Sequence, residues 1–248
     1  MAIGGEFTSQ LIAKAGISSG DCVLDYGCGN GDVCLLLAQT VGPQGRVLGI
    51  DQNPESLEMA RERAETAGLA NIEFRQIDLG DVPNDLGEFD AMIGRRILLY
   101  LTEPVQVVRS LMKHLKVDGV FASHEHDTAF DHPANGAMPA HRRAKALVIE
   151  MLAAENARDN LGPELPHLLT AAGLKVSGAI ASAILQTPNS PYPIGAMLMA
   201  SKARLAAAKG VSEDDLNLDE LIASLEQEQS AEAFYWADTM YGAWGTKR

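Results

Sequence analysis

Three glycines, Gly27, Gly29 and Gly31, stand where the apolar run Val23–Leu24 gives way to a helical pattern. Glycine has no Cβ, so the backbone of such a loop can approach a ligand closely. In open α/β sheets, ligands bind beyond the carboxyl ends of the strands, which is where this loop would lie. The loop therefore predicts a site for a nucleotide-like ligand.

Asp32 occupies the position at which a dinucleotide-binding loop has its third glycine, counted from Gly27 as Gly-x-Gly-x-x-Gly. The N-terminus of a helix favours anions, and a carboxylate placed there would repel a pyrophosphate. The aspartate therefore disfavours NAD as the ligand of the loop.

Two further aspartates follow the next two apolar runs. Asp51 comes 20 residues after Gly31 and ends the run Val47–Ile50. A carboxylate there can accept two hydrogen bonds from a ribose diol. Asp78 ends the run that begins at Ile72, where it can accept a hydrogen bond from the exocyclic amine of adenine. The loop and both aspartates together predict a site for an adenosine without phosphates.

Alternating strand and helix patterns between residues 21 and 127 would position these residues. Strands are predicted at 23–25, 47–51, 72–78, 89–93 and 119–123. Helices are predicted over 32–40, from Pro54 to a stop at Gly68 with Asn53 as N-cap, and from Pro104. This alternation is typical of βαβ units and a parallel α/β sheet.

Four segments in this order resemble the motifs of class I S-adenosylmethionine-dependent methyltransferases: Val23–Gly31, Gly49–Asp51, Gln76–Leu79 and Phe89–Ile93. The resemblance covers residues 8–127. It implies a doubly wound, mostly parallel, seven-stranded Rossmann-like sheet with helical additions over the active edge. It also implies S-adenosyl-L-methionine as cofactor and S-adenosyl-L-homocysteine as product.

The resemblance assigns eight residues to cofactor binding: Asp25, Gly27, Gly29, Asp51, Gln52, Asp78, Leu79 and Arg95. The first three would line the methionine and ribose side, Asp51 would hold the ribose hydroxyls, and Asp78 with the Leu79 backbone would read adenine. Arg95 would meet the methionine carboxylate. Gln52 departs from the apolar residue often found beside the adenine.

The segments 94–101, 162–166 and 244–245 resemble bacterial small-molecule methyltransferases of the ubiquinone and menaquinone C-methylation type. This implies one methyltransferase domain over 1–248 with a cofactor-binding core at 1–127. The mostly helical insertions 128–160 and 186–230 would then form a substrate cap.

Two histidines, His124 and His126, end the predicted strand at 119–123. If the acceptor is a phenol or an acidic carbon, a histidine base can remove its proton, so both are candidate catalytic residues. Tyr100, Glu125 and Asp127 are candidate substrate-binding residues. The alternative is that residues 124–127 have no catalytic role and that their side chains form hydrogen bonds with loops. A metal site is disfavoured because two histidines spaced by one residue lack a third ligand in register.

The chain is acidic, with 33 Asp and Glu against 20 Lys and Arg and a net charge of −13. A surface that neutralises phosphates needs excess Lys and Arg, so nucleic acid is not an expected partner.

No apolar run reaches the roughly 18 residues of a membrane span, and the first residues lack a basic segment leading into an apolar block, so we expect a cytoplasmic protein. Cys22, Cys28 and Cys34 are expected to be buried reduced thiols.

The predicted reaction is methyl transfer to a small organic acceptor by in-line displacement. The acceptor and the choice of oxygen, nitrogen or carbon stay open, as does a homodimer. Two alternatives are a catalytically inactive S-adenosylmethionine-binding regulatory or partner protein and a nicotinamide-dependent oxidoreductase. Asp32 opposes the second.

Overall fold

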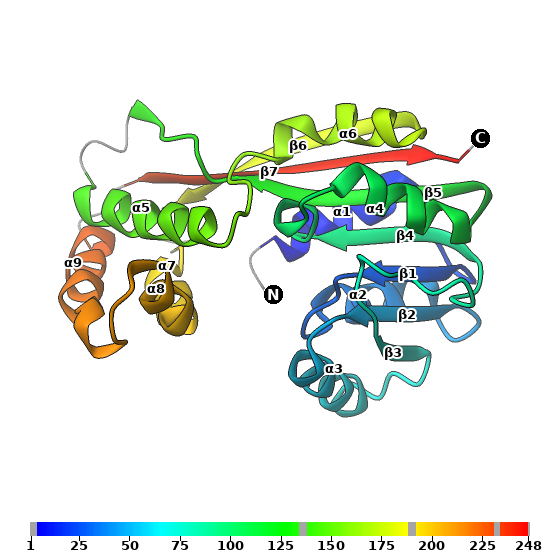
Figure 1. Ribbon diagram of the computed structural model, residues 1–248, viewed down its shortest axis with the longest axis horizontal. Coiled ribbons are helices and arrows are strands. Elements are labelled where there is room, and N and C mark those ends of the chain that lie inside the picture. The colour runs from blue at the N-terminus through cyan, green and yellow to red at the C-terminus, as the bar shows by residue number, and fades with distance from the viewer. Residues whose placement is uncertain (1–3, 134–137, 188–191, 231–233, 248) are drawn as a thin grey trace. The chain divides into compact units, whose positions relative to one another are not determined.

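The computed structural model describes residues 4–133, 138–187, 192–230 and 234–247 (Figure 1). The strands are β1 Cys22–Tyr26, β2 Arg46–Asp51, β3 Ile72–Gln76, β4 Phe89–Arg95, β5 Leu115–Asp127, β6 Lys175–Gln186 and β7 Tyr235–Thr246. The α-helices are α1 Gly5–Ala15, α2 Asp32–Val41, α3 Pro54–Thr66, α4 Pro104–Leu111, α5 Pro139–Ala154, α6 Leu165–Ala172, α7 Ile194–Ala200, α8 Lys202–Lys209 and α9 Leu218–Ser230. Short 3-10 turns are η1 Leu98–Tyr100, η2 Met112–His114, η4 Gly162–Glu164 and η5 Asp214–Leu216.

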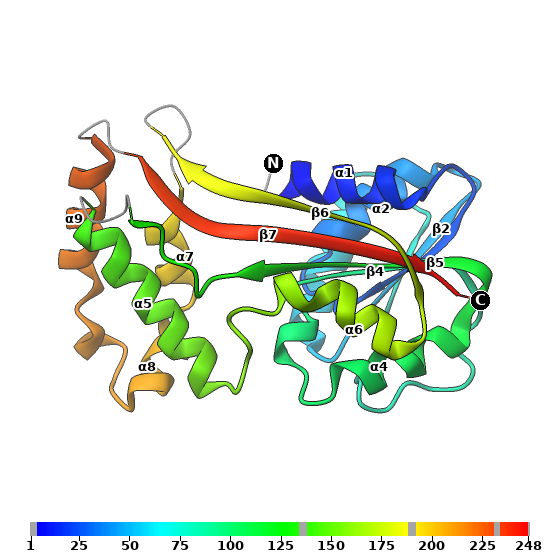
Figure 2. The same ribbon diagram turned by 90° about the horizontal axis from the view of Figure 1, so that it is seen from above.

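The described strands form one seven-stranded sheet in the order β3-β2-β1-β4-β5-β7-β6. Strands β3, β2, β1, β4 and β5 pair in parallel. Strand β7 runs the other way (Figure 2): the Asp118 N–H donates to the Lys247 carbonyl and the Lys247 N–H donates to the Gly119 carbonyl, which places the start of β5 beside the end of β7. The predicted mostly parallel, seven-stranded sheet is confirmed.

Strand β1 is the point at which the order of strand addition reverses. Strands β2 and β3 lie on one side of β1, whereas β4 and β5 lie on the other. Asp25 is in register with Gly49 of β2 and Ile93 of β4. A crevice forms beyond the carboxyl ends of the strands at such a switch point, so the glycine loop after β1 enters a ligand-binding position.

The chain divides into two compact units. Unit 1 consists of residues 1–125, 162–181 and 241–248, and unit 2 consists of residues 126–161 and 182–240. The predicted insertions 128–160 and 186–230 fall within unit 2, and their role as a substrate cap stays a prediction.

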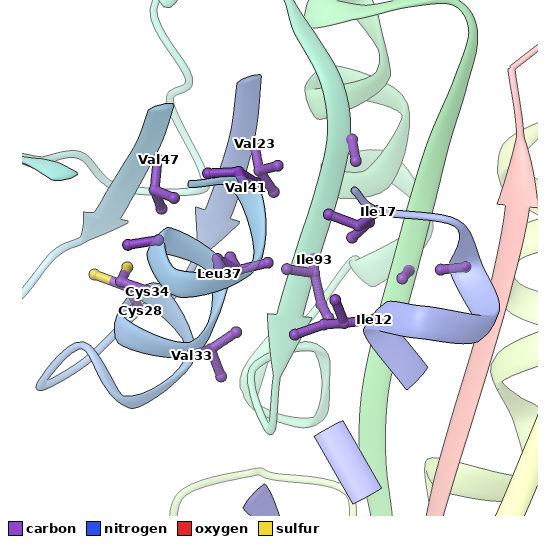
Figure 3. Close-up of a cluster of buried hydrophobic side chains, with 14 of the residues drawn as sticks. Ile12, Ile17, Val23, Cys28, Val33, Cys34, Leu37, Val41, Val47 and Ile93 are labelled. Carbon is purple, nitrogen blue, oxygen red and sulfur yellow. The ribbon is translucent and has the colours of Figure 1, made fainter. Parts of the chain in front are cut away.

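In unit 1 the helices lie on both faces of the sheet, with α1 and α2 on one face and α4 and α6 on the other (Figure 2). The face under α1 and α2 carries the main core, in which Ile12 of α1, Leu37 of α2 and Ile93 of β4 converge (Figure 3). The apolar stripe of α2 supplies Val33, Leu37 and Val41 to this core. The spacing of these residues by four places them on one helix face, which explains the predicted helix.

Two predicted helix caps have different outcomes. The side chain of Asn53 accepts hydrogen bonds from the N–H groups of Glu55 (2.9 Å) and Ser56 (3.1 Å), so the predicted N-cap of α3 is confirmed. In the sequence, Ser212 and Asp215 resemble a capping pair for the helix that contains Leu218, and the two side chains do bond to each other. They do so at the short turn η5 and not at the start of α9, because Asn217 adopts a left-handed conformation between the two elements.

Unit 2 has its own apolar core, built from α5, α7, α8, α9 and the start of β7. Its members include Met151, Leu198, Leu205, Leu221 and Tyr235. The longest described helix of the unit, α5, has 16 residues. Across the described ranges, no helix is both long and apolar enough to cross a membrane.

Candidate functional site

A pocket of about 400 Å³ opens in unit 1 beyond the carboxyl ends of β1, β2 and β3. Six residues predicted for cofactor or substrate binding line it: Gly27, Asp51, Gln52, Asp78, Leu79 and Tyr100. Its volume lies within the range typical of small-molecule sites. The three strand ends predicted to meet around one ligand therefore share one cavity.

The glycine loop is shaped by its backbone. Gly27, Gly29 and Gly31 all have φ in the left-handed region, at 70°, 51° and 82°. A Cβ added to Gly27 would lie 2.4 Å from Cγ1 of Ile97, so glycine is required there by both conformation and space. The Gly27 N–H also donates to the Ile50 carbonyl (2.8 Å), which ties the loop to the end of β2.

Asp51 is held by two backbone groups. Its Oδ2 accepts from the Gly29 N–H (2.8 Å) and its Oδ1 accepts from the Asn53 N–H (2.9 Å). The half-buried carboxylate is thereby fixed between the glycine loop and the cap of α3. Asp78 is oriented in a similar way, since its Oδ1 accepts from the Gly80 N–H (2.8 Å).

Asp25 lies beneath the loop and is fully buried. The Cys34 thiol donates to its Oδ2 (3.0 Å), while its Oδ1 has no hydrogen-bond partner among the described residues. Burial raises the pKa of Asp25 to about 7. The three cysteines are buried and free, as predicted.

Arg95 extends from the end of β4 and is mostly buried. Its Nη2 donates to Asp32 Oδ2 (2.9 Å), and Arg63 Nη2 donates to Asp32 Oδ1 (2.6 Å). Partial burial acts to raise the pKa of Asp32, but the hydrogen bonds and charges of both arginines outweigh it and the pKa is lowered. Because two guanidinium groups compensate this carboxylate, Asp32 repels an anionic ligand less than the sequence suggested.

His124 and Glu125 of β5 are both fully buried in unit 1. Nδ1 of His124 lies 3.1 Å from Thr8 Oγ1, and its ring centroid lies 4.8 Å from that of Phe7. Glu125 Oε1 accepts from the N–H groups of Ile97 and Leu98. Neither side chain is exposed in this conformation, and the roles predicted for them in catalysis and substrate binding stay predictions.

His126 and Asp127 belong to unit 2. Nδ1 of His126 lies 3.4 Å from Oδ2 of Asp238, a β7 residue that no local sequence pattern connects with His126 because the two are 112 positions apart. Asp127 Oδ1 accepts from the N–H groups of Ala129 and Phe130 (3.1 and 3.2 Å) and so caps the turn after β5. The predicted catalytic and substrate-binding roles of this pair stay predictions.

Arg142, Arg143 and Lys145 of unit 2 are close together in the sequence, and a short basic cluster on a helix usually forms a solvated face. Arg142 is exposed and pairs with Asp131 (2.9 Å), as expected for a solvated face. Lys145 is buried instead, and its Nζ donates to the carbonyl groups of Phe130 and Ala237. Burial lowers the pKa of this lysine.

Most residues on one wall of the pocket belong to no predicted site. Four of them, Ile97, Leu101, Thr102 and Glu103, lie between β4 and α4, and a fifth, Val107, lies in α4. This segment carries no glycine pattern or charged motif of its own. Only the resemblance of 94–101 to a family segment singled it out.

A family described as "Methyltransferase domain" matches residues 17–173 of the chain. An arsenite methyltransferase of Halobacterium salinarum is 44% identical over 71 residues, which are 29% of this chain and 18% of that protein. A ubiquinone/menaquinone biosynthesis C-methyltransferase UbiE of Pseudomonas putida is 35% identical over 114 residues, which are 46% of this chain and 43% of that protein. The chain thus spans less than half the length of these curated relatives.

The solved structures agree on the fold. The crystal structure of a putative methyltransferase from Bacillus halodurans superposes with a TM-score of 0.64 over 98% of this chain and 99% of that chain, at 18% sequence identity. At this identity the likeness concerns the fold alone. The family match covers more than half of the chain, and Gly27, Asp51 and Asp78 line one pocket. The chain therefore belongs to the methyltransferase domain family, as a class I S-adenosylmethionine-dependent member.

Proposed function

We propose that this protein transfers a methyl group from S-adenosylmethionine to a small organic acceptor, at an oxygen, nitrogen or carbon atom. The observation that carries the proposal is the shared pocket of Gly27, Asp51 and Asp78, which follow three neighbouring strands. Relatives named for arsenite and for ubiquinone or menaquinone biosynthesis support a small acceptor. The net charge of −13 argues against a polyanionic one.

Two buried polar atoms of unit 1 suit the charged ends of the methionine part of this cofactor. Arg95 Nη1 is a cationic donor without a hydrogen-bond partner among the described residues, and it would hold the carboxylate. Asp25 Oδ1 is an acceptor that also lacks a hydrogen-bond partner among the described residues, and it would hold the ammonium group. A buried group of either kind costs free energy until it is paired, so both favour a zwitterionic ligand.

The remaining cofactor contacts follow from groups that the chain already orients. Asp51 would accept from the ribose hydroxyls, since backbone N–H groups hold its carboxylate at the pocket. Asp78 and the backbone of Leu79 would form hydrogen bonds with the adenine, and Gln52 would lie beside it.

S-adenosylmethionine, when bound, supplies a methyl group activated by a sulfonium centre. The chain has to bind and orient the reactants and to exclude water. Apolar side chains of Leu79, Ile97 and Leu101 on the pocket wall serve water exclusion. For an acceptor that must lose a proton, we propose His126 or His124 as the base, and Asp238 would orient the ring of His126.

Ligand binding separates this function from its alternatives. The full chain is titrated with S-adenosylhomocysteine and with NAD, and the unfolding temperature is followed, because a ligand of the folded state raises it. We expect stabilisation by S-adenosylhomocysteine alone, and stabilisation by NAD alone would overturn the proposal. Labelled S-adenosylmethionine is then incubated with phenols, quinols and amines. Tight binding without transfer to any of them would favour an inactive cofactor-binding protein.

Replacing Asp51 tests the cofactor contact directly. We expect Asp51→Ala to weaken S-adenosylhomocysteine binding about 10- to 100-fold, since a charged acceptor of the ribose hydroxyls is lost together with the anchor of Gly29. Isothermal titration calorimetry measures the affinity. Glu58→Ala, an exposed carboxylate paired with Arg61 on the surface of α3, is the control that should leave it unchanged. Equal affinities of wild type and Asp51→Ala would contradict the placement.

A further inference from the structure

Glu125 makes two hydrogen bonds to the chain segment that forms the pocket wall. Its side chain has no exposed surface. Its Oε1 accepts from the N–H of Ile97 (3.1 Å) and from the N–H of Leu98 (2.8 Å). These groups begin the turn η1, whose first N–H groups have no partner within the turn. One buried carboxyl oxygen thus replaces the partners that the turn lacks.

The preceding residue is tied to the same strand. The Arg96 N–H donates to the His124 carbonyl (2.8 Å), so three consecutive N–H groups, from Arg96 to Leu98, bond to two consecutive residues of β5. Arg96 has a φ of 56°, which is unfavourable for a side chain other than glycine. Such a backbone persists only when its surroundings hold it in place. The bonds from β5 supply that constraint.

The held segment contacts the glycine loop. The Ile97 side chain occupies the space beside Gly27, where an added Cβ would meet it at 2.4 Å. Ile97 and Tyr100 both line the pocket that contains Asp51 and Asp78. The position of the Ile97 backbone therefore determines how much room remains above the first glycine.

We propose that Glu125 is a positioning residue of the cofactor site, which holds the segment 96–103 so that Ile97 and Tyr100 form the wall facing the glycine loop. This inference rests on the proposed function, because it takes the pocket to be the S-adenosylmethionine site. It gives Glu125 a role different from the substrate contact expected from the sequence.

The second oxygen of Glu125 indicates which substitution preserves the role. Oε2 is buried without a hydrogen-bond partner among the described residues. Burial raises the pKa of Glu125 to about 8, against the opposing effects of the Leu98 and Ile97 N–H groups and the Arg96 charge. Burial therefore favours the neutral, protonated form of the carboxyl group. Glutamine has the same shape, the same charge and the same accepting oxygen, so it should replace this glutamate.

The test compares S-adenosylhomocysteine affinity, measured by calorimetry at pH 7, among full-length variants. Glu125→Gln should bind within about twofold of wild type, whereas Glu125→Ala should bind at least about tenfold more weakly because two N–H groups lose their acceptor. Glu125→Leu fills the same space without an acceptor and should behave like Glu125→Ala, should the alanine variant not fold.

A matched control and a ligand-free measurement complete the test. Asp90 also accepts a backbone N–H, that of Cys22 (2.9 Å), but it lies at the start of β4 and outside the pocket. Asp90→Ala should lower stability without changing affinity. Amide hydrogen exchange of the unliganded chain should show Ile97 and Leu98 protected in wild type and Glu125→Gln, and exchanging at least about tenfold faster in Glu125→Leu.

The outcomes distinguish the two proposals. Suppose that wild type binds S-adenosylhomocysteine. If the Glu125→Leu and Glu125→Ala variants then bind it as well as wild type does, the role of Glu125 is overturned while the proposed function stands. The same holds if Glu125→Gln loses as much affinity as Glu125→Leu and Glu125→Ala. Unchanged amide exchange in Glu125→Leu also overturns it. If wild type binds no S-adenosylhomocysteine, the proposed function fails and the role of Glu125 at a cofactor site fails with it.

Discussion

Among single residues, two buried carboxyl groups of unit 1 are unusual, and both lie next to segments that border the pocket. Asp25 and Glu125 are fully buried, and burial raises the pKa of Asp25 to about 7 and that of Glu125 to about 8. In each of them one oxygen accepts hydrogen bonds, one for Asp25 and two for Glu125, and the other oxygen has no partner among the described residues. Such groups cost stability when they ionise, so they are expected to have a role in shaping or filling the pocket.

Asp25 predicts a pH dependence of stability. The unfolded chain releases this proton near pH 4, but the folded chain retains it to about pH 7, so the folded state binds more protons between these values. The contribution of Asp25 to the free energy of unfolding is therefore largest below pH 4. This contribution falls by at most about 4 kcal/mol as the pH rises to 7. Asp25→Asn removes the titration.

Urea denaturation of wild type and Asp25→Asn at pH 4, 5.5 and 7 measures this contribution. The free energy of unfolding of the variant, relative to that of wild type, should increase as the pH rises. The reason is that only wild type has to retain a proton or bury a charge at position 25. Parallel curves for the two proteins would show that Asp25 titrates normally.

Among the elements, two of the segments that border the pocket contact each other closely, and this contact explains why position 27 has to be a glycine. The glycine loop after β1 has no room for a side chain at Gly27, because Ile97 from the segment after β4 fills that space. The two loops lie at neighbouring carboxyl ends, since β1 and β4 pair in parallel. Glycine is thus required for the approach of the second loop as well as for the approach of a ligand.

Gly27→Ala tests this contact, with Gly68→Ala as its matched control. Both glycines have positive φ, at 70° and 67°, but a Cβ at Gly68 meets nothing within 4 Å. Gly68→Ala should cost only the backbone strain of about 1 kcal/mol and leave S-adenosylhomocysteine affinity unchanged. Gly27→Ala should cost more stability and weaken binding at least about tenfold, because Ile97 has to move. Calorimetry and urea denaturation measure both, and equal effects of the two substitutions would contradict the contact.

For the molecule as a whole, charge is the dominant feature. The chain carries a net charge of −13, and the pocket itself includes Asp51, Asp78 and Glu103. An acidic protein attracts cations over distances comparable with the Debye length, which is about 30 Å at 0.01 M salt and about 3 Å at 1 M. S-adenosylmethionine carries one more positive charge than S-adenosylhomocysteine, so the field should favour the substrate form over the product.

This field predicts a salt dependence that differs between the two compounds. Raising the salt concentration from about 0.01 M to about 1 M should weaken the binding of S-adenosylmethionine more than that of S-adenosylhomocysteine, because only the first carries the sulfonium charge. Calorimetric titrations of both ligands at each salt concentration give the ratio of the affinities. A ratio that does not change with salt would show that local contacts alone select the ligand.

The local sequence was sufficient to predict most of the parallel sheet and to predict that residues at three strand ends meet in one pocket. Asn53 caps α3 as predicted, and Gly27, Asp51 and Asp78 meet because each follows a strand of one parallel sheet. Parallel strands joined by right-handed crossovers bring their carboxyl ends to one edge, so a residue's place along the chain already implies its place at the site.

Contacts between distant segments could not be predicted in this way. The bonds of Glu125 to the segment at Ile97, the proximity of Asp238 to His126 and the burial of Lys145 all depend on how β5, β7 and the helices pack. A carboxylate or lysine in a strand or helix pattern has the same appearance whether its neighbours are water or protein. Burial and pairing arise from packing across the fold, so the full burial of Glu125 and its bonds to a distant segment were visible only in the tertiary structure.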